Sequence, residues 1–270
     1  MVLKAVLFDM DGVLADTEGF YNRRRAAYLT DVLPSYEGPW DFAGSNDRAI
    51  WETIVPDDPV LRERLHAGYD AYRAEHPEDY YVLGNPDAST IFAALKMAGL
   101  LVGIASSSEV AMIERMMAET GLTALVDAYV SGHDVPHHKP APDVYFACME
   151  QLGVQPVECV VVEDSPTGIE AGVAADARVV ALTQYVAPAT DQSAAHERIA
   201  HLGDLLALLG LQQVARVLWG SPAAAKCWLV PVVPPSSENG TGPPHASLYD
   251  MVSGSAMSAC RNYRSFLAGL

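Results

Sequence analysis

Five short apolar runs alternate with helical patterns along the first 210 residues of this 270-residue chain, and this alternation constrains the fold most strongly. Continuous apolar strands separated by helices are typical of a parallel sheet covered on both faces. The expected strands are residues 2–8, 100–105, 126–130, 159–162 and 178–182. The expected helices between the later strands are residues 88–98, 109–120, 142–152 and 166–175. We therefore expect an α/β fold with a doubly wound, Rossmann-like parallel sheet.

The ends of these helices carry residues that commonly begin or stop a helix. Ser108 is expected to cap the helix that opens at Glu109, and Gly121 is expected to close it. Ser165 followed by Pro166 is typical of an N-cap and a first helical turn.

One stretch, residues 17–85, interrupts the alternation because it contains amphipathic helical patterns but no convincing strand. The patterns cover residues 20–30, 47–54 and 60–73. Such an insertion reads as a separate all-helical domain, with hinges after Asp16 and at residues 83–86. The expected core domain therefore comprises residues 1–16 and 86–210, and the inserted helical domain comprises residues 17–85.

The last 60 residues differ in composition from the rest of the chain. Residues 211–270 carry a net charge of +2 and six of the 18 prolines, whereas the first 210 residues carry −19. Pro, Gly and Ser interrupt every apolar run there, so we expect an irregular, mobile tail. The sequence assigns no site to it.

Composition excludes several classes of protein. A net charge of −17 argues against binding to nucleic acid, since phosphate backbones require clusters of Lys and Arg. No apolar run reaches 18 residues, so no membrane span is expected, and the first apolar run, residues 5–8, is followed by an Asp, which argues against a signal peptide. The cysteines form no CxxC pair and are expected to be thiols in a reducing cytoplasm. They are Cys148, Cys159, Cys227 and Cys260.

Polar residues follow three of the expected strands directly. The carboxyl ends of parallel strands meet at one edge of a sheet, where ligands bind. Carboxylates gathered there repel one another unless a cation lies among them, which favours Mg²⁺ and, with it, a phosphate group on the substrate. The residues concerned are Asp9, Asp11, Gly12, Ser106, Ser107, Ser108, Glu163, Asp164 and Ser165.

A lysine adds a positive charge to this expected site. Lys139 lies in a Lys-Pro-Ala-Pro segment just before a helical pattern. At the same edge of the sheet it would neutralise a phosphoryl group during transfer.

Four motifs, in this order and spacing, resemble the haloacid dehalogenase superfamily. They are Phe8-Asp9-Met10-Asp11-Gly12-Val13-Leu14 with Asp16-Thr17-Glu18, then Ala105-Ser106-Ser107-Ser108, then Lys139-Pro140-Ala141-Pro142-Asp143, then Glu163-Asp164-Ser165 with Gly168-Ile169. The resemblance covers roughly residues 1–210 and is strongest to the branch of sugar-phosphate phosphatases and β-phosphoglucomutases with a helical cap.

The resemblance implies a role for each of these residues. Asp9 would be the nucleophile that becomes an aspartyl phosphate, and Asp11 would be the general acid and then the general base. Mg²⁺ would be bound by Asp9, the backbone carbonyl of Asp11 and Asp164, with Glu163 assisting. Ser106 and Lys139 would hold the phosphoryl oxygens, helped by backbone N–H groups near Asp11 and Ser107. The helical insertion would be a cap that closes over the substrate.

Residues of the expected cap are assigned to the substrate less directly. Four of them share one helix face that could overlook the site, although a solvated face with a Glu18–Asn22 pair fits the same spacing. Arg48 could reach a phosphate or carboxylate of the substrate. The four residues on the helix face are Glu18, Tyr21, Asn22 and Arg25.

Differences between this sequence and the family pattern indicate which of the family's activities to expect. No lysine occurs between Lys4 and Lys96, so the cap offers no amine for a Schiff base and no lysine to grip the second phosphate of a bisphosphate. We therefore expect a Mg²⁺-dependent phosphatase of a small phosphorylated metabolite, a sugar or polyol phosphate. A β-phosphoglucomutase-like transferase and a catalytically silent binding module remain the alternatives.

Overall fold

The computed structural model describes residues 2–40, 42 and 47–212. The chain divides into two units, Met1–Leu208 and Leu209–Leu270, and the sheet and helices belong to the first. Nearly all of the expected tail, residues 211–270, lies outside the described residues.

The centre of the described chain is a parallel sheet of six strands in the order β3-β2-β1-β4-β5-β6, which confirms the expected α/β fold. In the register of the sheet, Phe8 at the end of β1 lies opposite Ile104 of β2 and Val162 of β4. The residues that follow these three strands therefore emerge side by side. The strands are β1 (Ala5–Phe8), β2 (Leu101–Ser106), β3 (Ala128–Ser131), β4 (Cys159–Glu163), β5 (Arg178–Leu182) and β6 (Glu197–Ile199).

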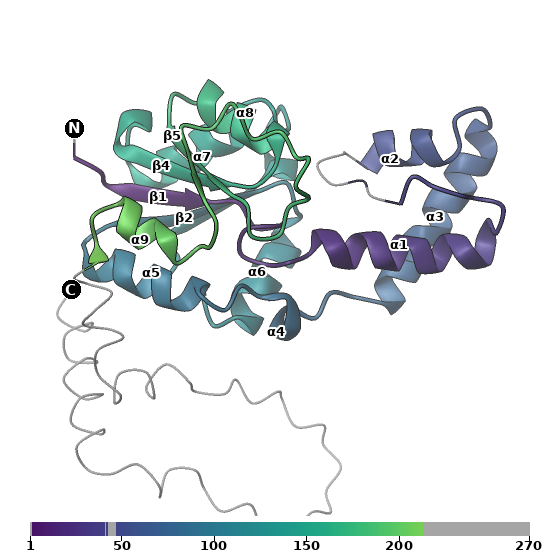
Figure 1. Cartoon of the computed structure of the whole chain (residues 1–270), viewed down its shortest axis with the longest axis horizontal. Helices are drawn as coiled ribbons and strands as arrows, with labels where there is room; N and C mark the ends of the chain where they lie inside the picture. Colours follow the sequence, from purple (N-terminus) through teal and green to yellow (C-terminus); the bar gives the residue numbers. More distant parts are fainter. Residues whose placement is uncertain (1, 41, 43–46, 213–270) are drawn as a thin grey trace, which may run out of the picture. The chain divides into compact units, whose positions relative to one another are not determined.

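Helices cover both faces of this sheet (Figure 1). On one face α7 (Asp143–Leu152) and α8 (Pro166–Ala174) enclose a core that includes Leu7 and Val161. On the other face α5 (Ala88–Met97) packs on β2 and α9 (Asp204–Leu208), and its Phe92 contacts Phe8. Because both faces are covered, all four residues of β1 are fully buried. α6 (Val110–Glu119) packs against β3.

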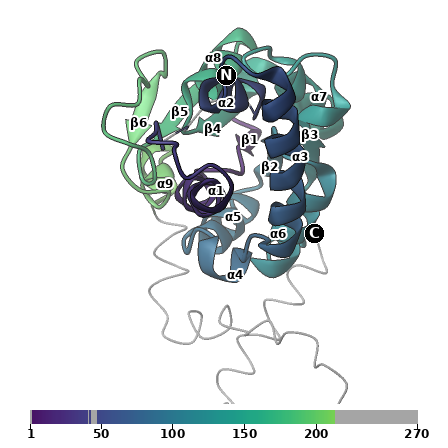
Figure 2. The same ribbon diagram turned by 90° about the vertical axis from the view of Figure 1, so that its right-hand side faces the viewer.

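Residues 17–85 form helices with a hydrophobic core of their own. The helices are α1 (Glu18–Val32), α2 (Asp47–Ile54), α3 (Pro59–Glu75) and the short α4 (Tyr80–Leu83), and Figure 2 views the first of them end-on. Tyr28, Trp51 and Tyr69 pack their rings against one another inside this cluster. The helical character expected of this stretch is therefore observed.

The chain crosses between the sheet and the helices twice, and the two crossings are hydrogen-bonded to each other. The N–H of Asp16 donates to the carbonyl of Leu83 at 2.8 Å, and the N–H of Asn85 donates to the carbonyl of Leu14 at 2.8 Å. The side chain of Asn85 is buried and donates to the carbonyl of Val13 at 2.9 Å. The two expected hinges thus lie side by side.

The expected helix ends are partly right. Ser165 accepts a hydrogen bond from the N–H of Gly168 at 3.1 Å, as an N-cap does, and Gly121 has a left-handed φ of 74° after α6. The N-cap expected at Ser108 is wrong. α6 begins at Val110 without a side-chain cap, and the hydroxyl of Ser108 donates to Asp11 instead. The short elements β6, α4 and α9 were not anticipated.

Shortening a buried side chain in the middle of the sheet should destabilise the fold. Leu7 is fully buried, so Leu7→Ala should lower the free energy of unfolding by about 3 kcal/mol, through lost burial and the cavity left behind. The matched control Val2→Ala, at a side chain that is 77% exposed, should change it by less than about 0.5 kcal/mol. Urea denaturation of both variants measures the difference, and equal stabilities would contradict this packing.

Candidate active site

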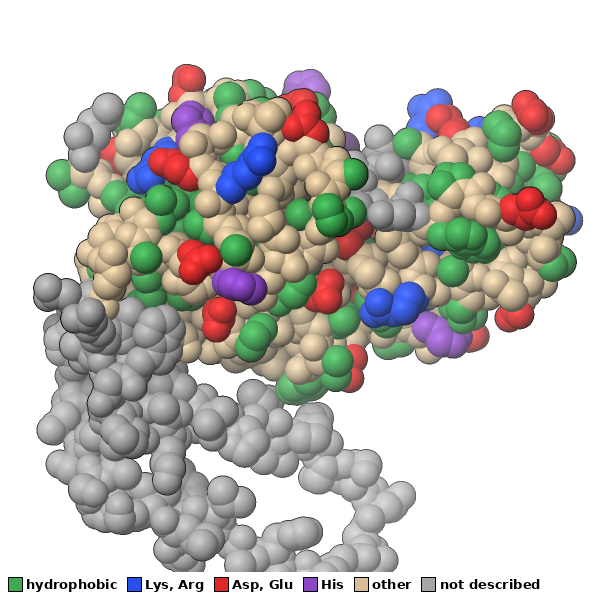
Figure 3. All heavy atoms as spheres, viewed as in Figure 1, with side chains coloured by type: hydrophobic (Ala, Val, Ile, Leu, Met, Phe, Trp, Pro, Cys, Tyr) green, Lys and Arg blue, Asp and Glu red, His purple; other side chains and the backbone are tan. Residues whose placement is uncertain are grey.

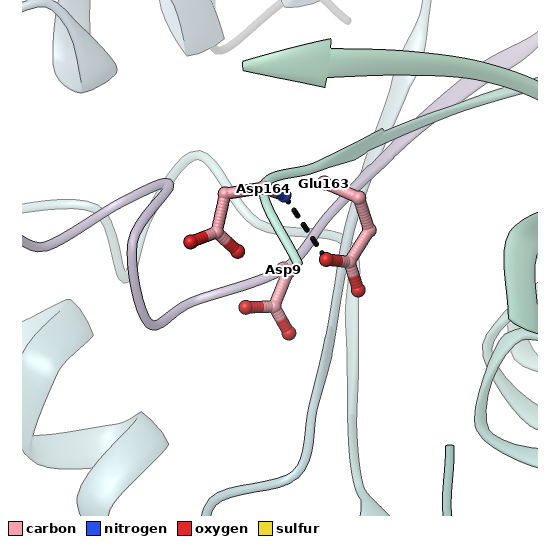
Figure 4. Close-up of side chains that lie close together, drawn as sticks. All are labelled: Asp9, Glu163 and Asp164. Carbon is pink, nitrogen blue, oxygen red and sulfur yellow. Dashed lines mark hydrogen bonds between the residues drawn. The ribbon is translucent and has the colours of Figure 1, made fainter. Parts of the chain in front are cut away.

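Three carboxylates from two neighbouring strand ends meet at the edge of the sheet. Asp9 follows β1, and Glu163 and Asp164 lie at the end of β4; all three residues are buried. Each offers an oxygen within 4.8 Å of the others, and Figure 4 shows the three side chains gathered together. These three carboxylates therefore gather at the edge of the sheet, as the strand ends predict.

Lys139 reaches this cluster from the loop before α7, and its side chain is 6% exposed. Its Nζ donates to Asp9 Oδ1 at 2.6 Å, to Glu163 Oε1 at 2.6 Å and to the carbonyl of Ala105 at 3.0 Å. Burial lowers the pKa of Lys139, but the carboxylates of Asp9 and Glu163 outweigh it and raise the pKa above its usual value. The lysine is thus a permanent positive charge beside Asp9.

Both carboxylate oxygens of Glu163 are already hydrogen-bonded within the protein. Oε1 accepts from Lys139 and from the hydroxyl of Tyr145, each at 2.6 Å. Oε2 accepts from the N–H of Asp164 at 3.1 Å and from the N–H and hydroxyl of Ser165 at 3.4 and 3.3 Å. Glu163 therefore serves first as an internal counter-charge that holds Lys139 and the turn after β4 in place.

Asp164 is held close to the turn after β1. A Cβ atom at Gly12 would lie 1.9 Å from Asp164 Oδ2, so only glycine allows this approach, and Gly12 has a left-handed φ of 78°. The backbone carbonyl of Asp164 accepts from Gln192 at 2.7 Å. Asp164 and Asp9 therefore stand on either side of one small space.

The electrostatics of this space favour a cation. Burial raises the pKa of Asp9 to about 8, with Glu163 and Asp11 adding to the rise and Lys139 opposing it. Burial and the carboxylates of Glu163 and Asp9 likewise raise the pKa of Asp164 well above its usual value. Oxygen donors of this kind suit a hard divalent ion, so the residues present fit Mg²⁺.

Asp11 lies beside the carboxylate cluster, and hydroxyl groups surround it. Its Oδ1 accepts from Thr17 at 2.6 Å and from Tyr21 at 2.9 Å, while its Oδ2 accepts from Ser108 at 2.6 Å. Burial and the charge of Asp11 raise the pKa of Tyr21, so this hydroxyl keeps its proton near neutral pH. Hydroxyls can donate or accept, which suits a carboxyl group that gains and loses a proton.

The two serines expected to bind phosphate differ in exposure. Ser106 is fully buried at the end of β2, and its hydroxyl oxygen accepts from the N–H of Ser108 at 3.0 Å. Ser107 is exposed. Their contact with a phosphoryl group stays a prediction.

A cavity of about 420 Å³ opens beside Asp164. From the helical part it is lined by Glu18 and Asn22, two of the residues expected to overlook the site. From the core it is lined by Asp164 and by the segment after β5, including Tyr185 and Thr190. The two parts of the chain thus both contribute to this cavity.

The other residues predicted to bind substrate lie elsewhere. Arg25 is buried, and its guanidinium lies 5.1 Å from the ring centroid of Phe42. The side chain of Arg48 is 87% exposed and pairs with Glu52 at 2.9 Å. Neither arginine lines the cavity beside Asp164. Tyr21 contacts Asp11 directly, as described above.

Several residues of the site were not anticipated from the sequence. The sequence indicates Thr17 only as part of a motif and Ser108 as part of a motif or a helix cap. Tyr145 lies in a helical pattern where an aromatic residue usually indicates core packing. The segment after β5 gave no signal beyond its position after a strand.

Within the described residues no helix is both long and apolar enough to cross a bilayer. On the face drawn in Figure 3, acidic, basic and apolar side chains are interspersed.

The chain belongs to the haloacid dehalogenase-like hydrolase family, whose profile matches residues 3–176. The expected resemblance is thereby confirmed, and so is the expectation that the chain is an enzyme of the hydrolase class.

Individual relatives agree with this assignment. The chain is 45% identical to fructose-1-phosphate phosphatase YqaB of Escherichia coli, over 63% of this chain and 91% of the relative. It is 32% identical to hexitol phosphatase B of the same species, over 65% of this chain and 82% of the relative. It spans only 18% of another relative, protein SUPPRESSOR OF QUENCHING 1 of Arabidopsis thaliana.

Solved structures of the family share the fold. A HAD family hydrolase from Deinococcus radiodurans R1, with bound phosphate and sodium, is 26% identical with a TM-score of 0.60. The similarity covers 78% of this chain and 97% of that one.

Magnesium should stabilise the protein by binding to the carboxylates of Asp9 and Asp164. At a concentration one hundred times its Kd, Mg²⁺ should add about 2.7 kcal/mol to the free energy of unfolding. Asp164→Asn should lose most of this effect because one ligand charge is removed, whereas the control Asp70→Asn, at an exposed position of α3, should keep it. Thermal denaturation with and without Mg²⁺ measures this gain in stability. An equal gain in wild type and in Asp164→Asn would contradict Mg²⁺ binding at Asp164.

Proposed function

We propose that the protein is a Mg²⁺-dependent phosphatase that hydrolyses a small phosphorylated metabolite through a phosphorylated Asp9. The observation that carries the proposal is the placement of Asp9. Its carboxylate is buried, paired with Lys139 at 2.6 Å, and followed two residues later by a carboxyl group surrounded by hydroxyls. This combines a nucleophile, a positive charge and a proton carrier within one site.

The first half of the reaction forms a new ester on Asp9. A carboxylate oxygen of Asp9 attacks phosphorus, and the bond between phosphorus and the ester oxygen of the substrate breaks. Asp11 gives its proton to that departing oxygen, so an alcohol leaves. Thr17, Tyr21 and Ser108 hold Asp11 in position for this transfer.

The second half restores the enzyme. A water molecule attacks the phosphorus of the aspartyl phosphate while Asp11 accepts its proton. The bond to Asp9 breaks, inorganic phosphate leaves, and both carboxyl groups return to their starting states. The same carboxyl group therefore acts as acid and then as base.

The remaining polar groups of the site bind the phosphoryl oxygens. Lys139 and the hydroxyl of Ser106, with N–H groups near Asp11 and Ser107, would hold them. Asp9, Asp164 and the carbonyl of Asp11 would hold Mg²⁺, with Glu163 beside them. When bound, the ion supplies positive charge that offsets the negative charge of the substrate phosphate.

The cavity supports a sugar or polyol phosphate as the substrate class. Besides Asp164, its lining contains the carboxylate of Glu18 and the polar groups of Asn22, Tyr185 and Thr190, all of which suit hydroxyl groups. The names of the two phosphatase relatives point the same way. In this proposal residues 17–85 are the cap and residues 1–16 and 86–210 the catalytic core.

The same lining disfavours the mutase alternative. A phosphomutase must retain a bisphosphate, yet no lysine occurs between Lys4 and Lys96, and Arg48 is paired with Glu52 outside the cavity. A hydrolase needs only access for water.

The described cysteines, Cys148 and Cys159, are buried thiols, in accord with a proposed place in the reducing cytoplasm.

The purified protein should release inorganic phosphate from sugar or polyol phosphates only when Mg²⁺ is present. Asp9→Asn should lower kcat by at least about a thousandfold, because the amide cannot form the phosphoryl ester. A screen of phosphorylated metabolites with phosphate detection measures both. Undiminished turnover by Asp9→Asn would exclude Asp9 as the nucleophile.

Removing the proton carrier should slow the reaction differently. Asp11→Asn should lower kcat/KM, which reports the step in which the alcohol leaves, by about a hundredfold or more, and less for p-nitrophenyl phosphate, whose leaving group needs little protonation. Steady-state kinetics on the two substrates measures the contrast. An equal loss on both would mean that Asp11 does not protonate the leaving group.

β-Glucose 1-phosphate separates the phosphatase from the mutase. We expect any turnover to yield free glucose and phosphate, because no Lys or Arg of the described residues lines the cavity to hold a second phosphate. A coupled assay for glucose 6-phosphate makes the measurement. Accumulation of glucose 6-phosphate with little free phosphate would support the mutase instead.

A further inference from the structure

Three charged side chains outside the carboxylate cluster form a largely buried ion triad. Glu78 Oε1 lies 2.9 Å from Nη1 of Arg24, and Glu78 Oε2 lies 2.6 Å from Nη2 of Arg115. The side chains of Arg24 and Glu78 are 5% and 6% exposed. Removing such charges from water is costly, so the triad calls for a reason beyond stability.

The triad joins the helical part of the chain to the core. Arg24 belongs to α1 and Arg115 to α6, while Glu78 lies in the segment between α3 and α4. Arg115 also donates to the backbone carbonyl of Glu78 at 3.2 Å, and Glu119 of α6 accepts from the N–H of Tyr80 at 3.0 Å. Glu78 is therefore bound to α6 of the core, and its ion pair with Arg24 links α1 to the same point.

From Arg24 the contacts continue to the catalytic carboxyl group. The guanidinium of Arg24 lies 5.2 Å from the ring centroid of Tyr21, which is three residues earlier and on the same face of α1. The hydroxyl of Tyr21 donates to Asp11 Oδ1 at 2.9 Å. An uninterrupted series of contacts thus runs from Glu78 through Arg24 and Tyr21 to Asp11.

The triad is unsuited to binding substrate. Glu78 neutralises the charge of Arg24. The Nη1 of Arg24 also donates to the carbonyl of His76 at 3.0 Å. None of the three side chains lines the cavity beside Asp164. Their contribution must therefore pass through other residues.

We propose that the ion triad Arg24–Glu78–Arg115 positions Tyr21 over Asp11, which makes Glu78 a positioning residue for the acid–base step. The inference rests on the proposed phosphatase activity and adds to it a group in the segment between α3 and α4. Loss of the negative charge at Glu78 frees Arg24, and the first turns of α1 then hold the Tyr21 hydroxyl less firmly against Asp11. The rate of the proton transfer falls, while binding of the substrate is little affected.

A double-mutant cycle tests the inference. Glu78→Gln keeps the shape of the side chain and should lower kcat about tenfold with KM changed less than about twofold, the scale of one hydrogen bond to a charged group. In a Tyr21→Phe background the same change should cost almost nothing further, because the effect passes through that hydroxyl. The control Glu197→Gln removes a more exposed ion pair, with Arg178 at 2.7 Å, and should leave kcat unchanged.

A second variant covers the case in which Glu78→Gln does not fold. Arg115→Gln removes charge at the more exposed end of the triad, whose side chain is 36% exposed, and should lower kcat by about threefold, again only when Tyr21 is present. Thermal denaturation of every variant separates loss of folded protein from loss of rate.

The outcomes are distinct. Reductions in kcat that multiply in the double variants, or variants that lose thermal stability at unchanged kcat, would overturn the positioning role while leaving the phosphatase intact. A wild-type protein without Mg²⁺-dependent phosphate release would overturn the proposed function, and the inference with it.

Discussion

The contact between the Lys139 ammonium and the carboxylates of Asp9 and Glu163 is the interaction on which the site depends. Three carboxylates are buried at two adjacent strand ends, and their mutual repulsion and desolvation would destabilise the fold without nearby positive charge. One lysine offsets part of this cost in the protein itself. The remaining excess of negative charge is what makes the space between Asp9 and Asp164 suitable for a divalent cation.

The core and the helical insertion divide the chemistry between them. The core supplies Asp9, Lys139 and the acidic pair after β4, all positioned by the register of parallel strands. The insertion supplies the Tyr21 hydroxyl to Asp11 and polar groups to the cavity, and hydrogen-bonded crossings at Asp16 and Asn85 connect the two. A buried carboxylate cluster from the core is thereby combined with a cavity lining to which both parts contribute polar groups.

Much of this arrangement could be predicted because it follows from local patterns. Apolar runs ending in Asp9 and Glu163 predict both the sheet and the meeting of the carboxylates, since strand register leaves few alternatives. The N-cap expected at Ser108 is wrong because a capping preference reflects only neighbouring residues. Its hydroxyl instead donates to Asp11, 97 positions away in the sequence. Tyr145 and Arg25 could not be placed either: a helical pattern gives the face of a side chain but not the group that it contacts across the core.

The central claim is that Asp9 and Asp164 share one divalent ion within reach of Lys139. Crystals of the protein grown with Mn²⁺ in place of Mg²⁺ test it most directly, because the anomalous signal locates the ion without reference to any activity. We predict a single strong peak bonded to carboxylate oxygens of Asp9 and Asp164 and to the carbonyl of Asp11, at about 2.0–2.3 Å. A peak elsewhere, or density showing these two side chains turned away from each other around water alone, would contradict the account.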